Sequence, residues 1–234
     1  MSGDRSRLPT GKRRQIRSYV LRKGRLTPGQ RRALDELWPQ FGVDWQNQPV
    51  DFTRQFGRQE PLAVEIGFGN GAVLAYSAKQ SPQINFVGIE VHPPGIGALL
   101  KVLAAEQITN VRIIAADAVE VLQLMFDDQC ISHLALLFPD PWPKKRHHKR
   151  RIIQLEFIDL LARKMRPGAV LHMATDWPEY ADWMTETFSS QPDFQLLSEP
   201  AGLVPGVISR PETRFEQRGL RLGHEVRDLF YRRI

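Results

Sequence analysis

From Leu62 onward, short apolar runs alternate with longer amphipathic segments. The apolar runs have strand length and predict strands at Leu62–Ile66, Asn85–Glu90, Val111–Ala116, Ile131–Phe138, Ala169–Thr175, Phe194–Leu197 and Asp228–Tyr231. The segments between them repeat their apolar positions at helical spacing and predict helices near Gly71–Gln80, Gly95–Glu106, Ala118–Phe126, Arg151–Met165 and Glu179–Phe188. Alternation of strands and helices is typical of an α/β protein, in which a parallel sheet carries helices on both faces.

The first 35 residues lack this periodicity. We expect residues 1–35 to form a basic, largely flexible N-terminal arm, joined through a short helix at Gln30–Leu37 to one domain over residues 36–234.

Positive charge is concentrated in two stretches of the chain. The 32 Lys and Arg and 26 Asp and Glu give a net charge of +6. Residues 1–32 alone carry +10 and Lys144–Arg151 carry +6, so the remaining residues sum to −10. An acidic body with two basic segments predicts a polyanionic partner. For the N-terminal segment taken alone, a solvated basic tail is the alternative.

Several classes of protein are excluded by composition. No apolar run approaches the ~20 residues of a membrane span, and the basic N-terminus lacks the apolar stretch of a signal peptide. The single cysteine, Cys130, excludes an internal disulfide and fits a reducing compartment. We therefore expect a cytoplasmic protein with no membrane partner.

An acidic residue stands at or beside the end of each of the first five predicted strands. These residues are Glu65, Glu90, Asp117, Asp140 and Asp176. Ligands of parallel α/β sheets bind outside the carboxyl ends of the strands, so the five acids are expected along one rim. Five carboxylates there would repel one another unless a ligand or cation lay among them, which predicts a binding site.

The turn after the first strand reads Glu65-Ile-Gly67-Phe-Gly69-Asn-Gly71. Glycines let the chain turn sharply and let the backbone lie against a ligand. The pattern fits both a dinucleotide site and the cofactor loop of class I methyltransferases. Glu90, 25 residues after Glu65, is placed to accept the ribose hydroxyls, and Asp117 to accept from an adenine amino group. Together they predict an adenosine-containing cofactor.

The fourth strand leads into Pro139-Asp140-Pro141-Trp142, where the prolines restrict the backbone around Asp140. This block and the cations after it, Phe138–Arg151, resemble the bacterial tRNA (guanine-N7-)-methyltransferase family, TrmB. So do Gly88–Gly97, Thr175–Trp177, Thr213–Gly219 and Arg221–His224. The resemblance runs from Arg17 to the C-terminus.

The resemblance implies the class I methyltransferase (Rossmann-like) fold, with a seven-stranded, mostly parallel sheet, helices on both faces and an antiparallel last strand. It implies methylation of N7 of guanosine 46 in the tRNA variable loop, with S-adenosyl-L-methionine as donor. The implied cofactor contacts are Glu65, Gly67, Gly69, Gly71, Glu90, Asp117 and Asp140, with Asp140 also catalytic. The implied substrate contacts are Lys144, Asp176, Thr213, Arg214, Phe215 and Glu216. The implied RNA contacts are Arg146, His147, His148, Lys149, Arg150 and Arg151.

Guanine N7 is already a nucleophile with a lone pair, so transfer needs alignment and a negative environment more than a base. A fixed carboxylate beside the ring stabilises the developing cation, a role open to Asp140 and Asp176. Glu216 or Asp176 could accept from guanine N1–H and N2–H, and the sequence leaves this division open.

We expect tRNA and not DNA as partner, and a monomer or weak homodimer. We expect no metal, because adjacent histidines without nearby Cys or carboxylate ligands are a weak metal signal. Two alternatives stay open from sequence. An NAD-dependent oxidoreductase explains the glycines but not the basic surfaces, and a catalytically inactive RNA-binding protein leaves the acids unexplained.

Overall fold

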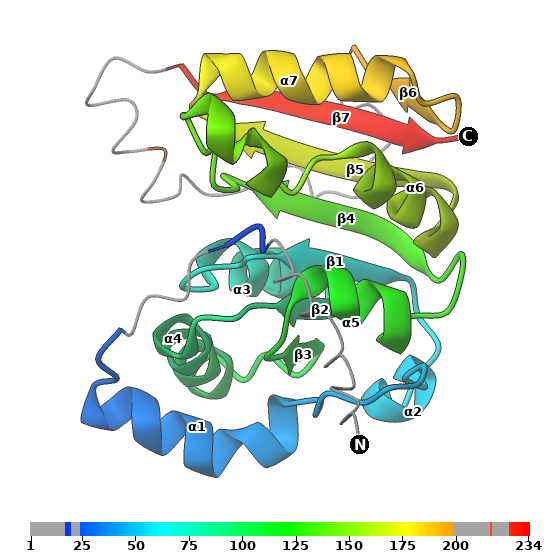
Figure 1. The fold of residues 1–234 in the computed structure, drawn as a ribbon. Coiled ribbons are helices and arrows are strands. Elements are labelled where there is room, and N and C mark those ends of the chain that lie inside the picture. Colours follow the sequence, from blue (N-terminus) through cyan, green and yellow to red (C-terminus); the bar gives the residue numbers. More distant parts are fainter. Residues whose placement is uncertain (1–16, 20–23, 199–215, 217–224) are drawn as a thin grey trace, which may run out of the picture.

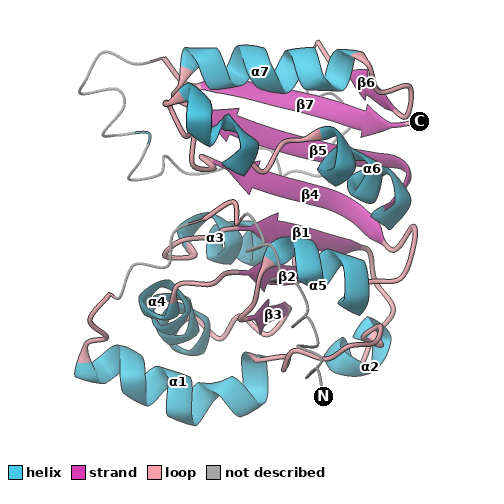
Figure 2. Cartoon of the chain, viewed as in Figure 1, coloured by secondary structure: helices cyan, strands magenta, loops and turns pink. Residues whose placement is uncertain are grey.

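The apolar runs form the strands of one seven-stranded sheet (Figure 1; Figure 2). The structure is a computed structural model that describes residues 17–19, 24–198, 216 and 225–234. The strands are β1 (Leu62–Ile66), β2 (Asn85–Ile89), β3 (Val111–Ile114), β4 (Ile131–Leu137), β5 (Met165–Thr175), β6 (Phe194–Leu196) and β7 (Arg227–Arg233). Their spatial order is β3-β2-β1-β4-β5-β7-β6, and β7 runs antiparallel to both β5 and β6, whereas the pairs among β1 to β5 are parallel. This topology confirms the expected fold.

Helices cover both faces of the sheet because side chains alternate between the faces along each strand. The helices are α1 (Pro28–Phe41), α2 (Phe52–Phe56), α3 (Ala72–Gln80), α4 (Pro93–Ala105), α5 (Ala118–Met125), α6 (Leu155–Lys164) and α7 (Pro178–Ser189), with a 3-10 helix, η1, at Lys145–Arg150. In β1, Leu62 and Val64 belong to the core under α5, α6 and α7, whereas Ala63 belongs to the core under α1, α3 and α4. Across the described residues, no helix is both long and apolar enough to cross a bilayer.

The body of the protein begins earlier than the expected boundary at residue 36. Helix α1 starts at Pro28, because Thr27 and Gln30 cap each other's backbone amides in a capping box. The helix then packs on α4, where the Gln30 side-chain amide donates to Pro94 O at 3.0 Å. Residues from Thr27 onward are therefore part of the folded domain.

Two further differences concern the ends of elements. Helix α6 begins at Leu155 and not at Arg151, and the preceding basic residues form η1, which the periodicity did not predict. The short helix α2 is also additional to the sequence prediction. Strand β5 begins at Met165, four residues before the predicted start at Ala169, and the other strand ends lie within two residues of the predicted ones.

The direction of strand addition reverses between β1 and β4. From β1 the chain builds outward through β2 and β3, and from β4 it builds the other way through β5. The loops after β1 and β4 therefore flank the point where a crevice opens in sheets of this class. Both loops are tied to the adjacent strand, by Gly67 N to Ile89 O and by Phe138 N to Ala174 O, each at 2.8 Å.

Candidate active site

The five predicted acids lie at one edge of the sheet, because the strands that carry them are parallel. Glu65 is the fourth residue of β1, Glu90 and Asp176 directly follow β2 and β5, and Asp117 and Asp140 lie in the loops after β3 and β4. Glu65 and Glu90 are buried, Asp117 and Asp176 are half-buried, and Asp140 is exposed. Their shared edge is the one predicted to bind ligand.

The glycine loop after β1 keeps an open surface at this edge. Gly67, Gly69 and Gly71 have φ of +70°, +57° and +76°, in the left-handed region that favours glycine. A Cβ atom added at Gly67 or Gly69 meets no atom of another described element within 4 Å, whereas one at Gly71 falls 2.6 Å from Leu99 of α4. The first two glycines leave room for a ligand against the backbone, and the third packs the loop on α4.

Glu90 holds the tip of the glycine loop. One carboxylate oxygen accepts from Gly69 N at 2.9 Å, and the other accepts from Val91 N at 2.7 Å and His92 N at 3.0 Å. A carboxylate has about four lone-pair positions, so Glu90 retains capacity for ligand hydroxyls. The side chain is thus oriented before any ligand arrives.

We call the open backbone surface at Gly67 and Gly69 the glycine cradle. Substitutions at Gly69 and Gly71 give a matched test of ligand binding there. We expect Gly69→Ala to weaken binding of S-adenosylhomocysteine, because the new methyl group enters the open space, at a stability cost of about 1 kcal/mol from the left-handed backbone. Gly71→Ala should mainly lower Tm, because its methyl group collides with Leu99. Isothermal titration and thermal unfolding separate the effects. An unchanged affinity of Gly69→Ala for S-adenosylhomocysteine would contradict binding of the ligand at the glycine cradle.

Tyr19 and Ser18 reach the same edge, which the sequence did not predict. Asp117 caps α5 by accepting from Val119 N at 2.9 Å, and the Tyr19 phenol lies near its carboxylate. Burial of the phenol and the Asp117 charge raise the pKa of Tyr19. Ser18 O accepts from Trp142 Nε1 at 3.1 Å. This short segment therefore bridges the loops after β3 and β4.

The loop that carries Asp140 is strained at both ends. Phe138 and Trp142 have φ of +52° and +44°, a conformation that costs a residue other than glycine about 1–3 kcal/mol. Such strain persists only where surrounding contacts over-determine it and is frequent at functional sites. Here Phe138 N bonds to Ala174 O, and the Arg150 guanidinium carbon lies 4.7 Å from the centre of the Trp142 ring. Asp140 is therefore presented to solvent on a constrained loop.

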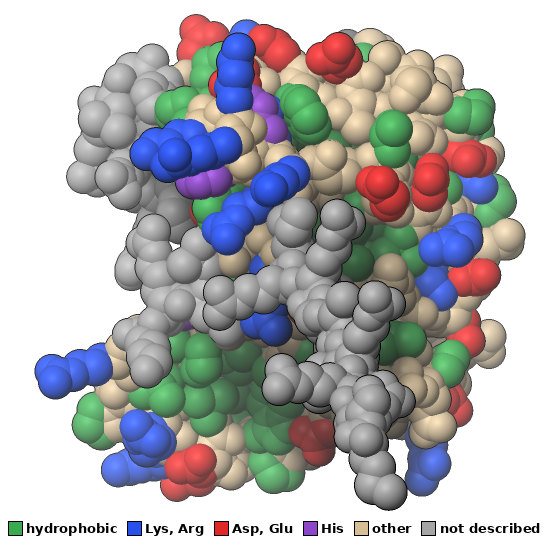
Figure 3. All heavy atoms as spheres, in the orientation of Figure 1, with side chains coloured by type: hydrophobic (Ala, Val, Ile, Leu, Met, Phe, Trp, Pro, Cys, Tyr) green, Lys and Arg blue, Asp and Glu red, His purple; other side chains and the backbone are tan. Residues whose placement is uncertain are grey.

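The basic run after this loop forms a cationic surface on η1 (Figure 3). Lys144, Arg146 and Lys149 are exposed, and His147, His148 and Arg150 are half-buried. Partial desolvation and the neighbouring Arg146 and Arg150 charges lower the pKa of His147. At neutral pH the histidine is therefore mainly uncharged, and the Lys and Arg side chains provide the positive field.

Arg151 does not share this surface. Its exposed fraction is 1%, and its guanidinium donates to Pro141 O and to the Glu179 carboxylate. The expectation that Arg151 contacts RNA disagrees with this position, because a phosphate cannot approach a side chain enclosed by protein. In sequence it is indistinguishable from the cations beside it.

The other predicted substrate residues come from two regions. Asp176 is half-buried directly after β5, and Glu216 is half-buried in a single described position. The predicted contacts Thr213, Arg214 and Phe215 lie outside the described residues. Within the described part of the chain, no group of three His, Cys, Asp or Glu side chains is arranged to hold a metal ion.

Comparisons with known proteins agree with this geometry. A model of the family described as "Putative methyltransferase" matches residues 59–229. The chain is 50% identical over 221 residues to "tRNA (guanine-N(7)-)-methyltransferase" of Shewanella amazonensis, across 94% of this chain and 93% of that protein. It is 52% identical to the protein of the same name from Salmonella typhimurium, across 94% and 92%. In fold it is similar to the crystal structure of the 16S rRNA methyltransferase KamB, with a TM-score of 0.55 and 16% identity over 80% of this chain and 95% of that one. The chain belongs to the tRNA (guanine-N(7)-)-methyltransferase family.

Proposed function

We propose that this protein transfers a methyl group from S-adenosyl-L-methionine to N7 of guanosine 46 in the variable loop of tRNA. The identity of about half of all residues with proteins named tRNA (guanine-N(7)-)-methyltransferase, across 94% of the chain, is the observation that carries this proposal. The open glycine cradle, the acidic rim and the cationic η1 lie together at the crevice side of the sheet, where such a reaction needs them.

The residues at this edge fit S-adenosyl-L-methionine, which when bound supplies an electrophilic methyl group on a sulfonium. Backbone at Gly67 and Gly69 would face the cofactor, since no other described residue fills that space. Glu90 would accept from the ribose hydroxyls, and Asp117 from the adenine amino group. Glu65, buried at the end of β1, adds a negative charge to balance the sulfonium and amino group.

The chain's own contribution to the chemistry is alignment and charge. Guanine N7 needs no deprotonation, so no strong base is required. Holding the nucleophile in line with the donor can contribute up to about 7–11 kcal/mol in favourable cases. Asp140, exposed on its constrained loop, would lie beside the purine and stabilise the positive charge that develops on it. Asp176 and Glu216 would accept from guanine N1–H and N2–H.

The exposed cations of η1 would hold the tRNA backbone beside the crevice. We expect Arg146→Ala to weaken tRNA binding and to reduce the slope of log Kd against log salt by about one, because one phosphate contact and its counterion release are lost. Fluorescence anisotropy over a salt series measures both quantities. Lys79→Ala is the matched control. It also removes one positive charge, but in the last turn of α3, at the end of this helix away from the glycine loop. There Lys79 pairs with Glu106 at 2.9 Å. Equal slopes in the two variants would contradict the assignment.

Transfer of a labelled methyl group tests the function. The protein would be incubated with tRNA from cells lacking the modification and with S-adenosyl-L-methionine carrying a trideuterated methyl group. Mass spectrometry of nucleosides and fragments should find the label as N7-methylguanosine at position 46 and none in a transcript with adenosine there. Label on another guanine atom, or elsewhere in the tRNA, would overturn the proposal.

A further inference from the structure

Arg151 occupies an unusual position for the last member of a basic run. It ends η1 as its C-cap residue, and its side chain is turned into the protein, whereas Lys149, two residues earlier, is exposed. Burying a guanidinium away from water is costly, and its Nη1 atom has no hydrogen-bond partner among the described residues. Replacing a buried ion pair by packed apolar side chains is often neutral or stabilising. Fold stability alone therefore does not require a cation at this point.

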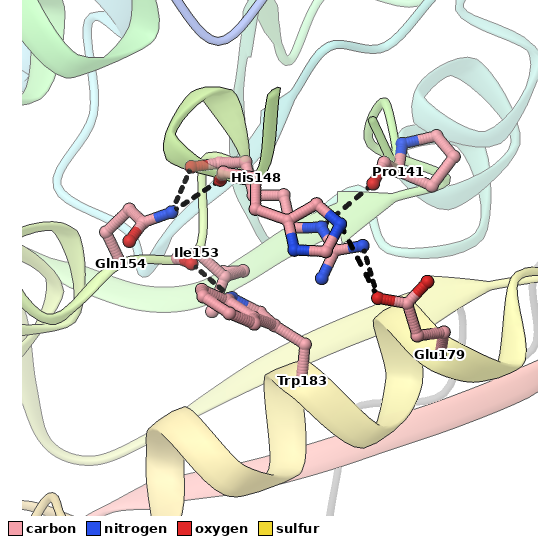
Figure 4. Close-up of polar contacts among 7 residues, drawn as sticks. Pro141, His148, Ile153, Gln154, Glu179 and Trp183 are labelled. Atoms are coloured by element: carbon pink, nitrogen blue, oxygen red, sulfur yellow. Dashed lines mark hydrogen bonds and ion pairs between the residues drawn. The ribbon is translucent and has the colours of Figure 1, made fainter. Parts of the chain in front are cut away.

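The Arg151 guanidinium joins three segments of the chain, and Figure 4 labels its partners Pro141 and Glu179. Its Nε atom donates to Pro141 O at 2.9 Å, and Nη2 donates to Glu179 Oε1 at 3.1 Å. Its central carbon lies 5.0 Å from the centres of both the Tyr180 and Trp183 rings, which fix the plane of the group. Arg151 thus connects the end of η1 with the loop after β4 and with the first turns of α7.

The bond to Pro141 acts on the strained part of the Asp140 loop. The Pro141 carbonyl belongs to the peptide that enters Trp142, the residue with φ of +44°. A hydrogen bond to that oxygen restricts rotation of the peptide plane between Pro141 and Trp142. It therefore helps to hold the left-handed φ of Trp142 and the orientation of Asp140, which precedes Pro141. Arginine suits this task, because Nε and Nη2 donate in one rigid plane.

The bond to Glu179 acts on the neighbouring loop. Glu179 lies in the first turn of α7, which begins two residues after Asp176. The same carboxylate oxygen lies 3.5 Å from His148 Nε2, so η1 and α7 meet at this acid. Helix α7 is also bonded to the segment between η1 and α6, because Trp183 Nε1 donates to Ile153 O at 2.9 Å. The Arg151 guanidinium therefore links the loop that carries Asp140 to the start of the helix that follows Asp176.

We propose that Arg151 is a positioning residue for methyl transfer, which holds the Asp140 loop against α7 through Pro141 and Glu179 and does not bind RNA. This inference rests on the proposed role of Asp140. It also assigns a second task to η1, because the helix that presents cations to the tRNA backbone ends in the residue that aligns the acidic loops.

The test compares Arg151→Lys with Lys149→Ala. Lysine keeps the charge but cannot donate to both acceptors in one plane. We expect the single-turnover rate of Arg151→Lys, at saturating S-adenosyl-L-methionine and tRNA, to fall by about tenfold to hundredfold, as for a misplaced catalytic group. Its Kd for tRNA, its Kd for S-adenosylhomocysteine and its salt slope should match the wild type. Lys149→Ala is the reference for a phosphate contact, with a raised Kd for tRNA and a slope lowered by about one.

Two results would overturn the positioning role. One is a wild-type rate in Arg151→Lys, and the other is a loss of tRNA affinity and slope equal to that of Lys149→Ala. Glu179→Gln tests the same link without changing Arg151, since an amide oxygen still accepts but carries no charge. Glu179→Gln should lower the rate of methyl transfer and leave the salt slope unchanged. A wild-type rate in both Glu179→Gln and Arg151→Lys would reject a positioning role for the contact between Arg151 and Glu179.

Two additional measurements separate this inference from what it rests on. Arg151→Ala in the presence of added guanidinium should regain part of the lost rate, because the ion can fill the vacated site. Absence of any recovery in a folded variant counts against the role. Asp140→Asn is assayed in parallel. If it is inactive while Arg151→Lys is fully active, only the positioning role fails, whereas an active Asp140→Asn overturns both proposals.

Discussion

Asp140→Asn is expected to lower the single-turnover rate of methyl transfer by about 10²–10³-fold, the range found when one preorganised electrostatic contact to a transition state is removed. The amide keeps the shape of the side chain on its strained loop but cannot offset the charge that develops on the purine. Affinity for tRNA should change little, because η1 supplies the backbone contacts. Rapid-quench assays at saturating substrates, with anisotropy for tRNA binding, measure the two effects.

Asp159→Asn is the matched control for this change. Asp159 is exposed on α6, which packs on one face of the sheet, and its replacement removes the same charge. We expect a rate like that of the wild type. If Asp140→Asn lost tRNA affinity and rate in equal proportion, Asp140 would be a binding residue, and its role in the transition state would have to be abandoned.

Glu90→Gln should weaken S-adenosylhomocysteine binding by about tenfold to hundredfold, since hydrogen bonds to charged groups contribute about 1.5–3 kcal/mol. Both carboxylate oxygens of Glu90 accept backbone N–H groups, from Gly69 on one side and from Val91 and His92 on the other. In glutamine an NH2 group replaces one of these two oxygens. An N–H donor of the side chain then faces backbone N–H donors, either that of Gly69 or those of Val91 and His92. The substitution thus removes charge at the ribose and also disturbs the glycine loop.

Isothermal titration with S-adenosylhomocysteine measures the affinity, and thermal unfolding reports the change in the loop. Glu156→Gln is the control, because Glu156 is exposed in the first turn of α6 and away from the glycine loop. NAD serves as a second ligand and should not raise the Tm of either protein. Affinity equal to that of the wild type in Glu90→Gln would exclude Glu90 as the ribose contact.

The sheet and its acidic rim were readable from sequence, because both depend on local pattern. Strand period and length placed β1 through β5, and parallel topology then put the acids at one edge. The start of α1 was also legible, since Thr27-Pro28-Gly29-Gln30 is a capping sequence. The basic residues around this sequence indicate a flexible arm instead, and they place the predicted domain boundary too late.

What the sequence could not show are contacts made only by tertiary packing. Arg151 follows Arg150 in an unbroken basic run, and its burial depends on Tyr180 and Trp183 from α7. Likewise Tyr19 reaches Asp117 across the fold from a segment without periodicity. The positive φ of Phe138 and Trp142 was equally hidden, because neither residue type favours that conformation. These features occur where the chain departs from regular structure.

A crystal structure of the complex with S-adenosylhomocysteine measures most directly whether the acidic rim is the cofactor site. We expect the adenosine to lie across Gly67 and Gly69, with its ribose hydroxyls on Glu90, its amino group on Asp117 and its sulfur facing Asp140. Binding of the ligand on another face of the molecule, with these side chains left in water, would contradict the site and the mechanism built on it.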